Sequence, residues 1–273
     1  MSDLPREPAP PDPDDDRLEP IFPGDPGRKK MSSRRRTVYA GAIVGAVVLA
    51  IVVAVVAATR EDTPPSRTTS ISQEDLDAPL ALRRAAAALN FEPVKQAGVG
   101  KVENQPAETG PPIQSPNLLT VGTKAPPFTL KTPAGKTVSL SDYRGKAVLL
   151  ELFAAWCPHC NAEAPYLAKL ARTMPASKYA FVSIDGSNES AATVYAFHRY
   201  FGLPYPALLD PSGEEPVTFP THGQPGPVSL AYHLAYFPTF YVIDPNGVIT
   251  WRGDGEQPTE LLQRELERAA GES

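Results

Sequence analysis

Residues 147–160 read Ala-Val-Leu-Leu-Glu-Leu-Phe-Ala-Ala-Trp-Cys-Pro-His-Cys, and this stretch decides the fold. The first seven residues are apolar except for Glu151, which is typical of a buried β-strand. Pro158 favours a helix that begins directly after Cys157, because the first helical position needs no backbone N–H. This helix is predicted to end near Thr173. A buried strand that leads through two cysteines into a helix predicts an α/β domain.

The residues around this stretch alternate between strand and helix patterns. Further strands are predicted at 128–130, 137–140, 179–184, 207–209, 239–243 and 248–251, and further helices at 189–201 and 259–269. Residues 210–235 are rich in Pro, Gly and His and are predicted as one long loop. The alternation, closed by an antiparallel hairpin, predicts a central mixed β-sheet with helices on both faces.

Three regions precede this domain. Residues 1–36 are rich in Pro and Asp and lack hydrophobic periodicity, so they are predicted to be a disordered tail. Residues 37–59 contain no charged side chain, and a helix of that length spans a hydrocarbon core of about 30 Å. Basic residues at 28–36 precede the span, which predicts a cytoplasmic N-terminus and an extracytoplasmic C-terminal domain at the cell membrane. A cleaved signal peptide is the alternative.

Residues 60–116 are predicted to form an extracytoplasmic stalk, since they are largely polar and rich in Pro and Gly. Within the stalk, the leucine spacing over 74–90 predicts a short amphipathic helix. A spacer role for that helix is favoured over a docking role. The folded domain is predicted to cover 117–273.

Composition excludes several classes of protein. The net charge of −5, with no basic cluster besides the one that flanks the apolar span, argues against nucleic-acid binding. Two cysteines exclude a scaffold with several disulfides and leave a redox pair, half a metal site or two idle thiols. A second Cys-x-x-Cys for a zinc site is missing, so neither a metal nor a cofactor is predicted.

The position of the two cysteines predicts thiol-disulfide exchange. Cys157 lies at the predicted helix N-terminus, where unpaired backbone N–H groups and the helix dipole favour a thiolate. Cys160 is one turn further along and lies within reach of a mixed disulfide on Cys157. We therefore predict an enzyme, a thiol-disulfide oxidoreductase, in which Cys157 is the nucleophile and Cys160 the resolving thiol.

Residues 117–273 resemble the thioredoxin superfamily, in particular its TlpA-like, redoxin-type extracytoplasmic proteins. The resemblance rests on motifs that occur in the family's order: Val121-Gly122-x-x-Ala125-Pro126-x-Phe128-x-Leu130, Leu140-Ser141-Asp142-Tyr143-Arg144-Gly145-Lys146, Phe153-Ala154-Ala155-Trp156-Cys157-Pro158-His159-Cys160, Pro165 and Phe237-Pro238-Thr239-Phe240. It implies a thioredoxin-like fold and exchange of disulfides with cysteine-containing extracytoplasmic proteins, such as secreted proteins or apocytochrome c. A membrane protein is expected as redox partner.

Two further residues are candidates for the catalytic site. Burial in the strand raises the pKa of a carboxyl group, so Glu151 is suited to accept the proton of Cys160, and the family has an acid here too. The alternative is an exposed Glu151 at the edge of the sheet. The resemblance implies a cis peptide at Pro238, which places the backbone of Phe237 beside Cys157 for an extended substrate; a trans proline at a strand start is the alternative.

Trp156 and His159 are predicted to contact substrate. Trp156 covers the disulfide or packs in the core. A Pro-His pair between the cysteines is also found in the strongly oxidising DsbA-type proteins, whereas TlpA-like relatives usually act as reductants. The direction of electron flow is therefore open, with a slight preference for an oxidase.

Two other functions compete with this prediction. A peroxiredoxin has a threonine three residues before its reactive cysteine, but this chain has Ala154. A copper metallochaperone is conceivable, because two thiolates and an imidazole suit Cu(I). However, related copper proteins have three residues between the cysteines. His198 is predicted to pack on a helix, and His222 and His233 are predicted to be solvated in the long loop, which is expected to shape substrate choice.

Overall fold

The structure, a computed structural model, describes residues 78–97, 99 and 117–272. The predicted tail at 1–36, the predicted membrane helix at 37–59 and most of the predicted stalk lie outside the described residues. Among the helices that are described, none combines the length and the hydropathy that a membrane span requires.

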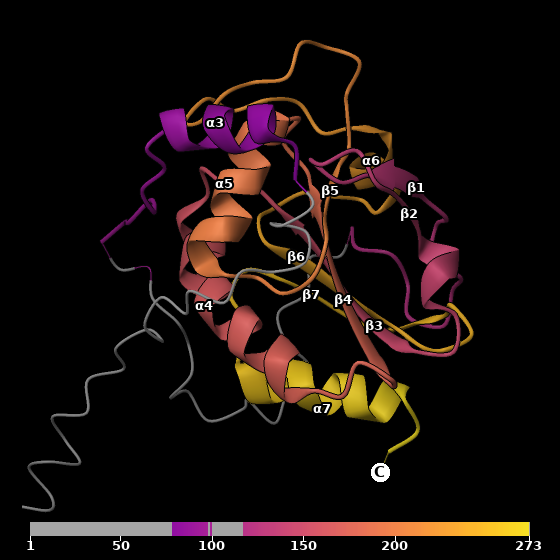
Figure 1. Cartoon of the computed structure of the whole chain (residues 1–273). Helices are drawn as coiled ribbons and strands as arrows, with labels where there is room; N and C mark the ends of the chain where they lie inside the picture. Colours follow the sequence, from indigo (N-terminus) through magenta and orange to yellow (C-terminus); the bar gives the residue numbers. More distant parts are fainter. Residues whose placement is uncertain (1–77, 98, 100–116, 273) are drawn as a thin grey trace, which may run out of the picture. The chain divides into compact units, whose positions relative to one another are not determined.

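In the part of the chain that the structure describes, seven strands form one mixed sheet (Figure 1). They are β1 (Thr129–Lys131), β2 (Thr137–Ser139), β3 (Ala147–Phe153), β4 (Tyr179–Asp185), β5 (Ala207–Leu209), β6 (Thr239–Ile243) and β7 (Ile249–Asp254). Their order is β2-β1-β5-β4-β3-β6-β7, and β3 pairs in parallel with β4 and antiparallel with β6. Every residue of β3 is buried, because β3 lies inside the sheet and both of its faces are covered.

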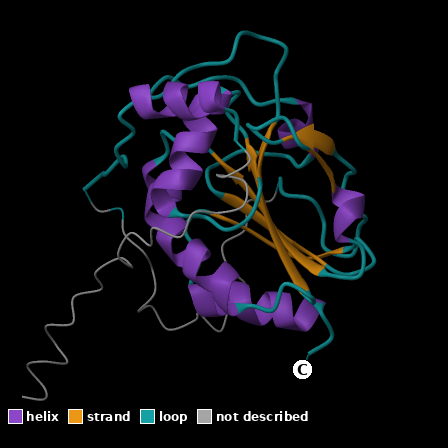
Figure 2. Cartoon of the chain, viewed as in Figure 1, coloured by secondary structure: helices purple, strands orange, loops and turns teal. Residues whose placement is uncertain are grey.

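Helices cover both faces of the sheet, as the sequence predicts. The long helices α4 (Pro158–Thr173), α5 (Ala191–Phe201) and α7 (Thr259–Ala269) pack on one face (Figure 2). The 3₁₀ helix η1 (Leu140–Tyr143) and the short α6 (Pro227–Ala231) lie against the other. Alternation along β3 separates the two cores, since Leu149 belongs to the first core and Leu150 to the second. The thioredoxin-like fold class is confirmed.

The 210–235 segment is not wholly a loop, which corrects the sequence prediction. Pro227 begins α6, and the buried Asp210 accepts the backbone N–H of Val228 (3.2 Å) and of Ser229 (2.6 Å). A helix of five residues is too short to show hydrophobic periodicity. Its N–H groups are satisfied by a carboxylate from the other end of the segment, and no local pattern reveals such a partner.

Helix α3 (Leu80–Ala88) and the residues after it pack on the domain, so the predicted spacer role is wrong for this part of the chain. Phe91 is buried, and its ring lies 5.0–6.5 Å, between centroids, from the rings of Phe197, Tyr200, Phe201 and Phe219. The backbone N–H of Val94 also donates to the Asn161 side chain (3.1 Å). Aromatic contacts therefore hold this segment against α5.

Candidate active site

The turn between β3 and α4 presents the two cysteines. Cys157 is the N-cap of α4 and is 4% exposed, whereas Cys160 lies one turn inside the helix and is fully buried. Both are free thiols, so the site is in its reduced form. The Asn161 side chain donates to the carbonyls of Ala155 (2.8 Å) and Cys157 (2.7 Å) and braces the turn. Asn161 could not be predicted as a site residue, because an Asn near the start of a helix is commonplace.

The two thiols differ in acidity. The pKa of Cys157 is lowered from 9.0 to about 7. A hydrogen bond from Cys160 is the largest cause, burial opposes it, and nearby backbone N–H groups and His159 also contribute to the lowering. Burial raises the pKa of Cys160, and the charges of Cys157 and Glu151 add to the rise. Near neutral pH a substantial fraction of the outer sulfur is therefore thiolate, while the inner sulfur keeps its proton.

Glu151 is buried in the middle of the sheet, so the alternative of an exposed strand edge is wrong. It is 3% exposed, and the Ser183 hydroxyl donates to its Oε2 at 2.6 Å. Burial is the main cause of the raised pKa values of Cys160 and Tyr205, and the charge of Glu151 adds to both. The carboxyl group thus lies in the same interior region as the Cys160 thiol.

Phe237 and Pro238 lie beside Cys157. The peptide bond between them is cis, as the resemblance implies. The Cys157 thiol donates to the Phe237 carbonyl oxygen, with 3.6 Å between sulfur and oxygen. Pro238 leads directly into β6, so the backbone next to Cys157 continues into the sheet.

Trp156 has three identified neighbours. Its indole N–H donates to the Ser187 hydroxyl (2.8 Å), and its ring meets Phe237 edge-on (5.5 Å, 87°). The imidazole of His222 stacks on it, with 3.8 Å between centroids and 26° between planes. His222 is exposed, as predicted, but its ring also adjoins the active site.

His159, between the cysteines, is held by an acid from the other end of the domain. Its Nδ1 lies 2.7 Å from Oε1 of Glu256, in the segment between β7 and α7. The His159 side chain is 45% exposed and that of Glu256 is 7% exposed. Glu256 was missed, since no sequence signal connects two residues 97 positions apart.

A buried acidic pair supports the turn from behind. Glu189 accepts the backbone N–H of Ala155 at 2.7 Å, and Asp185 accepts that of Glu189 at 2.6 Å. Burial raises the pKa of Asp185 to about 7 and that of Glu189 well above its usual value, and the charge of Asp185 adds to the rise at Glu189. Neither residue was predicted. The only signal is an acid at the end of an apolar strand, followed four residues later by another.

Comparisons with known proteins agree with this geometry. The AhpC/TSA family matches residues 121–252. The thioredoxin-like protein YneN of Bacillus subtilis is 35% identical over 148 residues, which cover 54% of this chain and 78% of YneN. The thiol-disulfide oxidoreductase ResA of Geobacillus kaustophilus is 33% identical over 151 residues, 55% of this chain and 78% of ResA.

The chain belongs to the TlpA/ResA-like thioredoxin-superfamily proteins. It is a thiol-disulfide oxidoreductase. A solved structure described as a putative thiol:disulfide interchange protein DsbE from Chlorobium tepidum is also similar, with 25% identity and a TM-score of 0.48. The match covers 56% of this chain and 99% of that one.

The remaining histidines of this TlpA/ResA-like chain lie elsewhere. His198 is buried against Phe153 and Tyr205, as its predicted packing role requires, and His233 contacts the Asn117 carbonyl. Within the ranges that the structure describes, no three His, Cys, Asp or Glu side chains form a group that could hold a metal ion.

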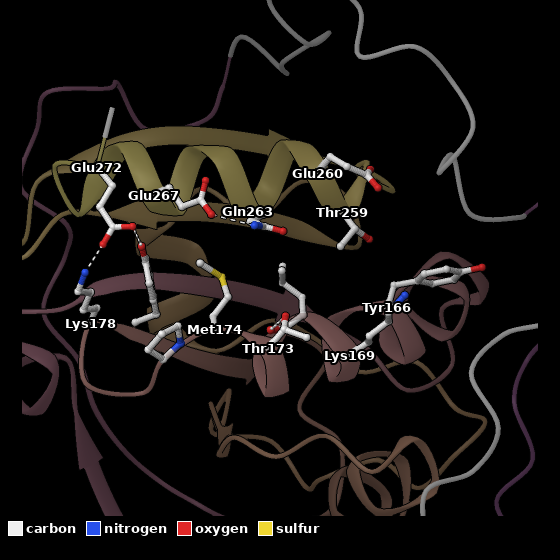
Figure 3. Close-up of a pocket in the computed structure, with 13 residues that line it drawn as sticks. Tyr166, Lys169, Thr173, Met174, Lys178, Thr259, Glu260, Gln263, Glu267 and Glu272 are labelled. Atoms are coloured by element: carbon white, nitrogen blue, oxygen red, sulfur yellow. Dashed lines mark hydrogen bonds and ion pairs between the residues drawn. The ribbon is translucent and has the colours of Figure 1, made fainter.

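A cavity of about 400 Å³ lies between α4 and α7 (Figure 3). Neither cysteine lines it. At one end, Glu272 accepts hydrogen bonds from Lys178 and from the Tyr179 hydroxyl, so charges of both signs already pair there. The cavity is separate from the redox site.

Proposed function

We propose that this oxidoreductase exchanges disulfides with cysteine-containing proteins outside the cytoplasm, with Cys157 as nucleophile and Cys160 as resolving thiol. One observation carries the assignment of roles: the pKa of the outer thiol is lowered to about 7, while that of the inner, buried thiol is raised. A thiolate is the attacking species in disulfide exchange, and a protonated thiol does not compete with it.

The exchange proceeds in two steps. The Cys157 thiolate attacks one sulfur of a substrate disulfide, forms a mixed disulfide and releases the first substrate thiolate. Cys160 then loses its proton and attacks the Cys157 sulfur, which forms the Cys157–Cys160 disulfide and releases the second substrate thiolate. Two electrons pass to the substrate, and the same steps in reverse oxidise a substrate dithiol. We assign the buried Glu151 as acceptor of the Cys160 proton.

Substrate docking is assigned to the backbone at Phe237. Its carbonyl lies 3.6 Å from the attacking sulfur, so an extended substrate segment that pairs there brings its own cysteine to Cys157. Trp156 and His159 flank the nucleophile in sequence and are assigned to contact the substrate beside it.

Two directions of electron flow have support in the site. The first candidate is oxidation of substrate thiols. His159 lowers the pKa of Cys157, and a stabilised thiolate favours the reduced form of the protein, which makes its disulfide a stronger oxidant. Reduction is the second candidate. The pKa of about 7 equals that of thioredoxin, a reductant, and exceeds the value of about 3.5 for DsbA.

The proposed location follows from the sequence alone. The apolar residues 37–59 serve as a single-pass anchor, and the basic residues before them keep the N-terminus in the cytoplasm. The domain would then act near the bilayer, on secreted proteins or apocytochrome c, and exchange electrons with a membrane redox partner. Disulfides persist in that compartment.

Trapping tests the assignment of the two cysteines. Cys160→Ser is expected to accumulate mixed disulfides with its partners, visible as adducts on non-reducing gels, because nothing resolves them. Cys157→Ser is expected to give none. Adducts on Cys157→Ser alone would reverse the roles, and adducts on neither variant would contradict the proposed exchange.

The direction is tested by the reduction potential of the folded domain, equilibrated against glutathione buffers. A potential near about −120 mV supports oxidation of substrates, and one near about −270 mV supports reduction.

A further inference from the structure

Residues 210–226, here called the 210–226 loop, run from the end of β5 to the start of α6 and are fastened to the segment between β4 and α5. Val217 bonds to both sides of Glu189, since its N–H donates to the Asn188 carbonyl (2.9 Å) and its carbonyl accepts the Ser190 N–H (2.7 Å). Further along, the backbone N–H of Phe219 donates to the Thr193 hydroxyl (3.2 Å). The loop therefore has a defined path toward the active site.

Ser187 joins the loop to the active-site tryptophan. Its buried hydroxyl accepts the indole N–H of Trp156 at 2.8 Å and the backbone N–H of Gly223 at 3.1 Å. Only glycine fits at 223, because a Cβ there would lie 2.2 Å from the Ser187 carbonyl oxygen. One side chain thus fixes both Trp156 and the residue that follows His222.

This connection places His222 against the ring of Trp156. The imidazole is exposed and stacks on the half-buried indole at 3.8 Å. The indole also contacts Phe237, whose carbonyl lies beside the Cys157 sulfur. Next to Phe237 in the chain, Tyr236 is 64% exposed. Aromatic surface with accessible polar atoms therefore extends from the nucleophile outward to the loop, a composition that suits protein recognition.

We propose that His222 is a specificity-determining residue: together with Trp156 it forms a platform that contacts the polypeptide chain on one side of the substrate's reacting cysteine. The proposal rests on the proposed exchange with protein substrates and adds a residue and a region of contact to it. The 210–226 loop is then the element that favours polypeptides over small thiols.

The chemistry at sulfur does not involve His222. When a substrate thiolate reacts with the oxidised protein, it attacks the Cys157 sulfur, the Cys157–Cys160 bond breaks, and its electron pair passes to Cys160, which takes up a proton. The second thiolate of the substrate then attacks the substrate sulfur of this mixed disulfide, which forms the substrate disulfide and releases Cys157 as a thiolate. A small dithiol completes both steps at the sulfurs alone, whereas a polypeptide also brings flanking residues that reach the platform.

The test compares two probes on the oxidised protein: dithiothreitol and reduced, unfolded ribonuclease A. The progress of exchange is measured by quenching samples with acid and alkylating the free thiols. His222→Ala is expected to slow the reaction with ribonuclease about three- to tenfold, the equivalent of an aromatic contact of roughly 0.7–1.4 kcal/mol. Its reaction with dithiothreitol is expected to stay within about twofold of the wild type, as is the reduction potential.

Two variants make the comparison specific. His222→Phe keeps a flat ring on Trp156 and is expected to restore the rate with ribonuclease. His233→Ala removes a histidine of the same segment that contacts Asn117, and it is expected to change neither rate. Equal slowing of both probes by His222→Ala, or no slowing with ribonuclease, would overturn the proposal. A wild-type protein that exchanges with dithiothreitol but not with ribonuclease would instead contradict the proposed function.

Discussion

Cys157 and Cys160 carry the same side chain, yet their surroundings shift their pKa values in opposite directions. Position on the helix explains the difference. The N-cap sulfur receives a hydrogen bond from its partner and lies near free backbone N–H groups, whereas the inner sulfur is wholly buried. The difference in acidity between the two cysteines thus follows from where the helix begins.

The hydrogen bond between the two cysteines is expected to control the reactivity of Cys157. Its pKa is lowered from 9.0 to about 7, so the alkylation rate should rise with pH to a midpoint near 7. Cys160→Ala removes the donor and should raise the midpoint by about one to two units, since hydrogen bonds to charged groups contribute roughly 1.5–3 kcal/mol. Iodoacetamide alkylation across pH measures it. Cys160→Ser, which keeps a donor, should stay closer to the wild type, and equal midpoints in the two variants would contradict the assignment.

The buried pair Asp185 and Glu189 predicts a fall in stability as pH rises. Each pKa is higher in the folded chain than in the unfolded one, so the stabilising contribution is complete below pH 4 and is lost toward the folded pKa, about 7 for Asp185. Glu189→Gln still offers an acceptor to Ala155 and removes one titrating group. In urea unfolding, the free energy of unfolding of this variant should fall less between pH 4 and 7 than that of the wild type, by more than about 1 kcal/mol.

The exposed Glu260, at the start of α7, gives the matched control for that experiment. Glu260→Gln is expected to keep the wild-type slope of stability against pH. If Glu189→Gln keeps that slope too, the pKa of Glu189 is not raised in the way that its burial implies.

At the scale of elements, α3 and Phe91 change the picture of the region before the domain. Phe91 is buried among four rings of α5 and the 210–226 loop. Phe91→Ala is expected to lower the free energy of unfolding by about 3–5 kcal/mol, the usual loss for a buried Phe. Leu80→Ala, on the same segment but 55% exposed, should change it by less than about 0.5 kcal/mol. Urea unfolding measures both changes. A decrease in the free energy of unfolding below about 1 kcal/mol for Phe91→Ala would mean that the segment is detached from the domain in solution.

Elements with a strong local pattern were predictable from the sequence. The bounds of β3, α4, β6 and α7 agree with the predictions. The strands are continuous apolar runs, and each helix begins at a local signal, Pro158 for α4 and Pro258-Thr259 for α7. The role of α3 was not predictable. An amphipathic helix reveals that one face is apolar, but not which surface covers it.

For the whole molecule, the candidate site residues that were predicted lie in local sequence motifs, whereas those that were not predicted are distant from these motifs in the chain. Cys157, Cys160, Glu151 and Pro238 lie at motif positions or in a distinctive strand. Glu256, Glu189 and His222 reach the same site from three different loops, and only the folded sheet brings them together. No periodicity or spacing encodes such contacts, so these three residues could not be predicted from the sequence.

The direction of electron flow is also a property of the whole molecule, because reduction potential and folding stability are linked. If the folded domain is a stronger oxidant than its unfolded chain, its reduced form must be the more stable one, by about 1.4 kcal/mol for every 30 mV. We expect the reduced protein to unfold at a higher urea concentration than the oxidised protein. His159→Ala should reduce the difference in unfolding urea concentration between the two forms, since His159 helps to lower the pKa of Cys157. A more stable oxidised protein would instead establish reduction as the direction, whatever residues lie between the cysteines.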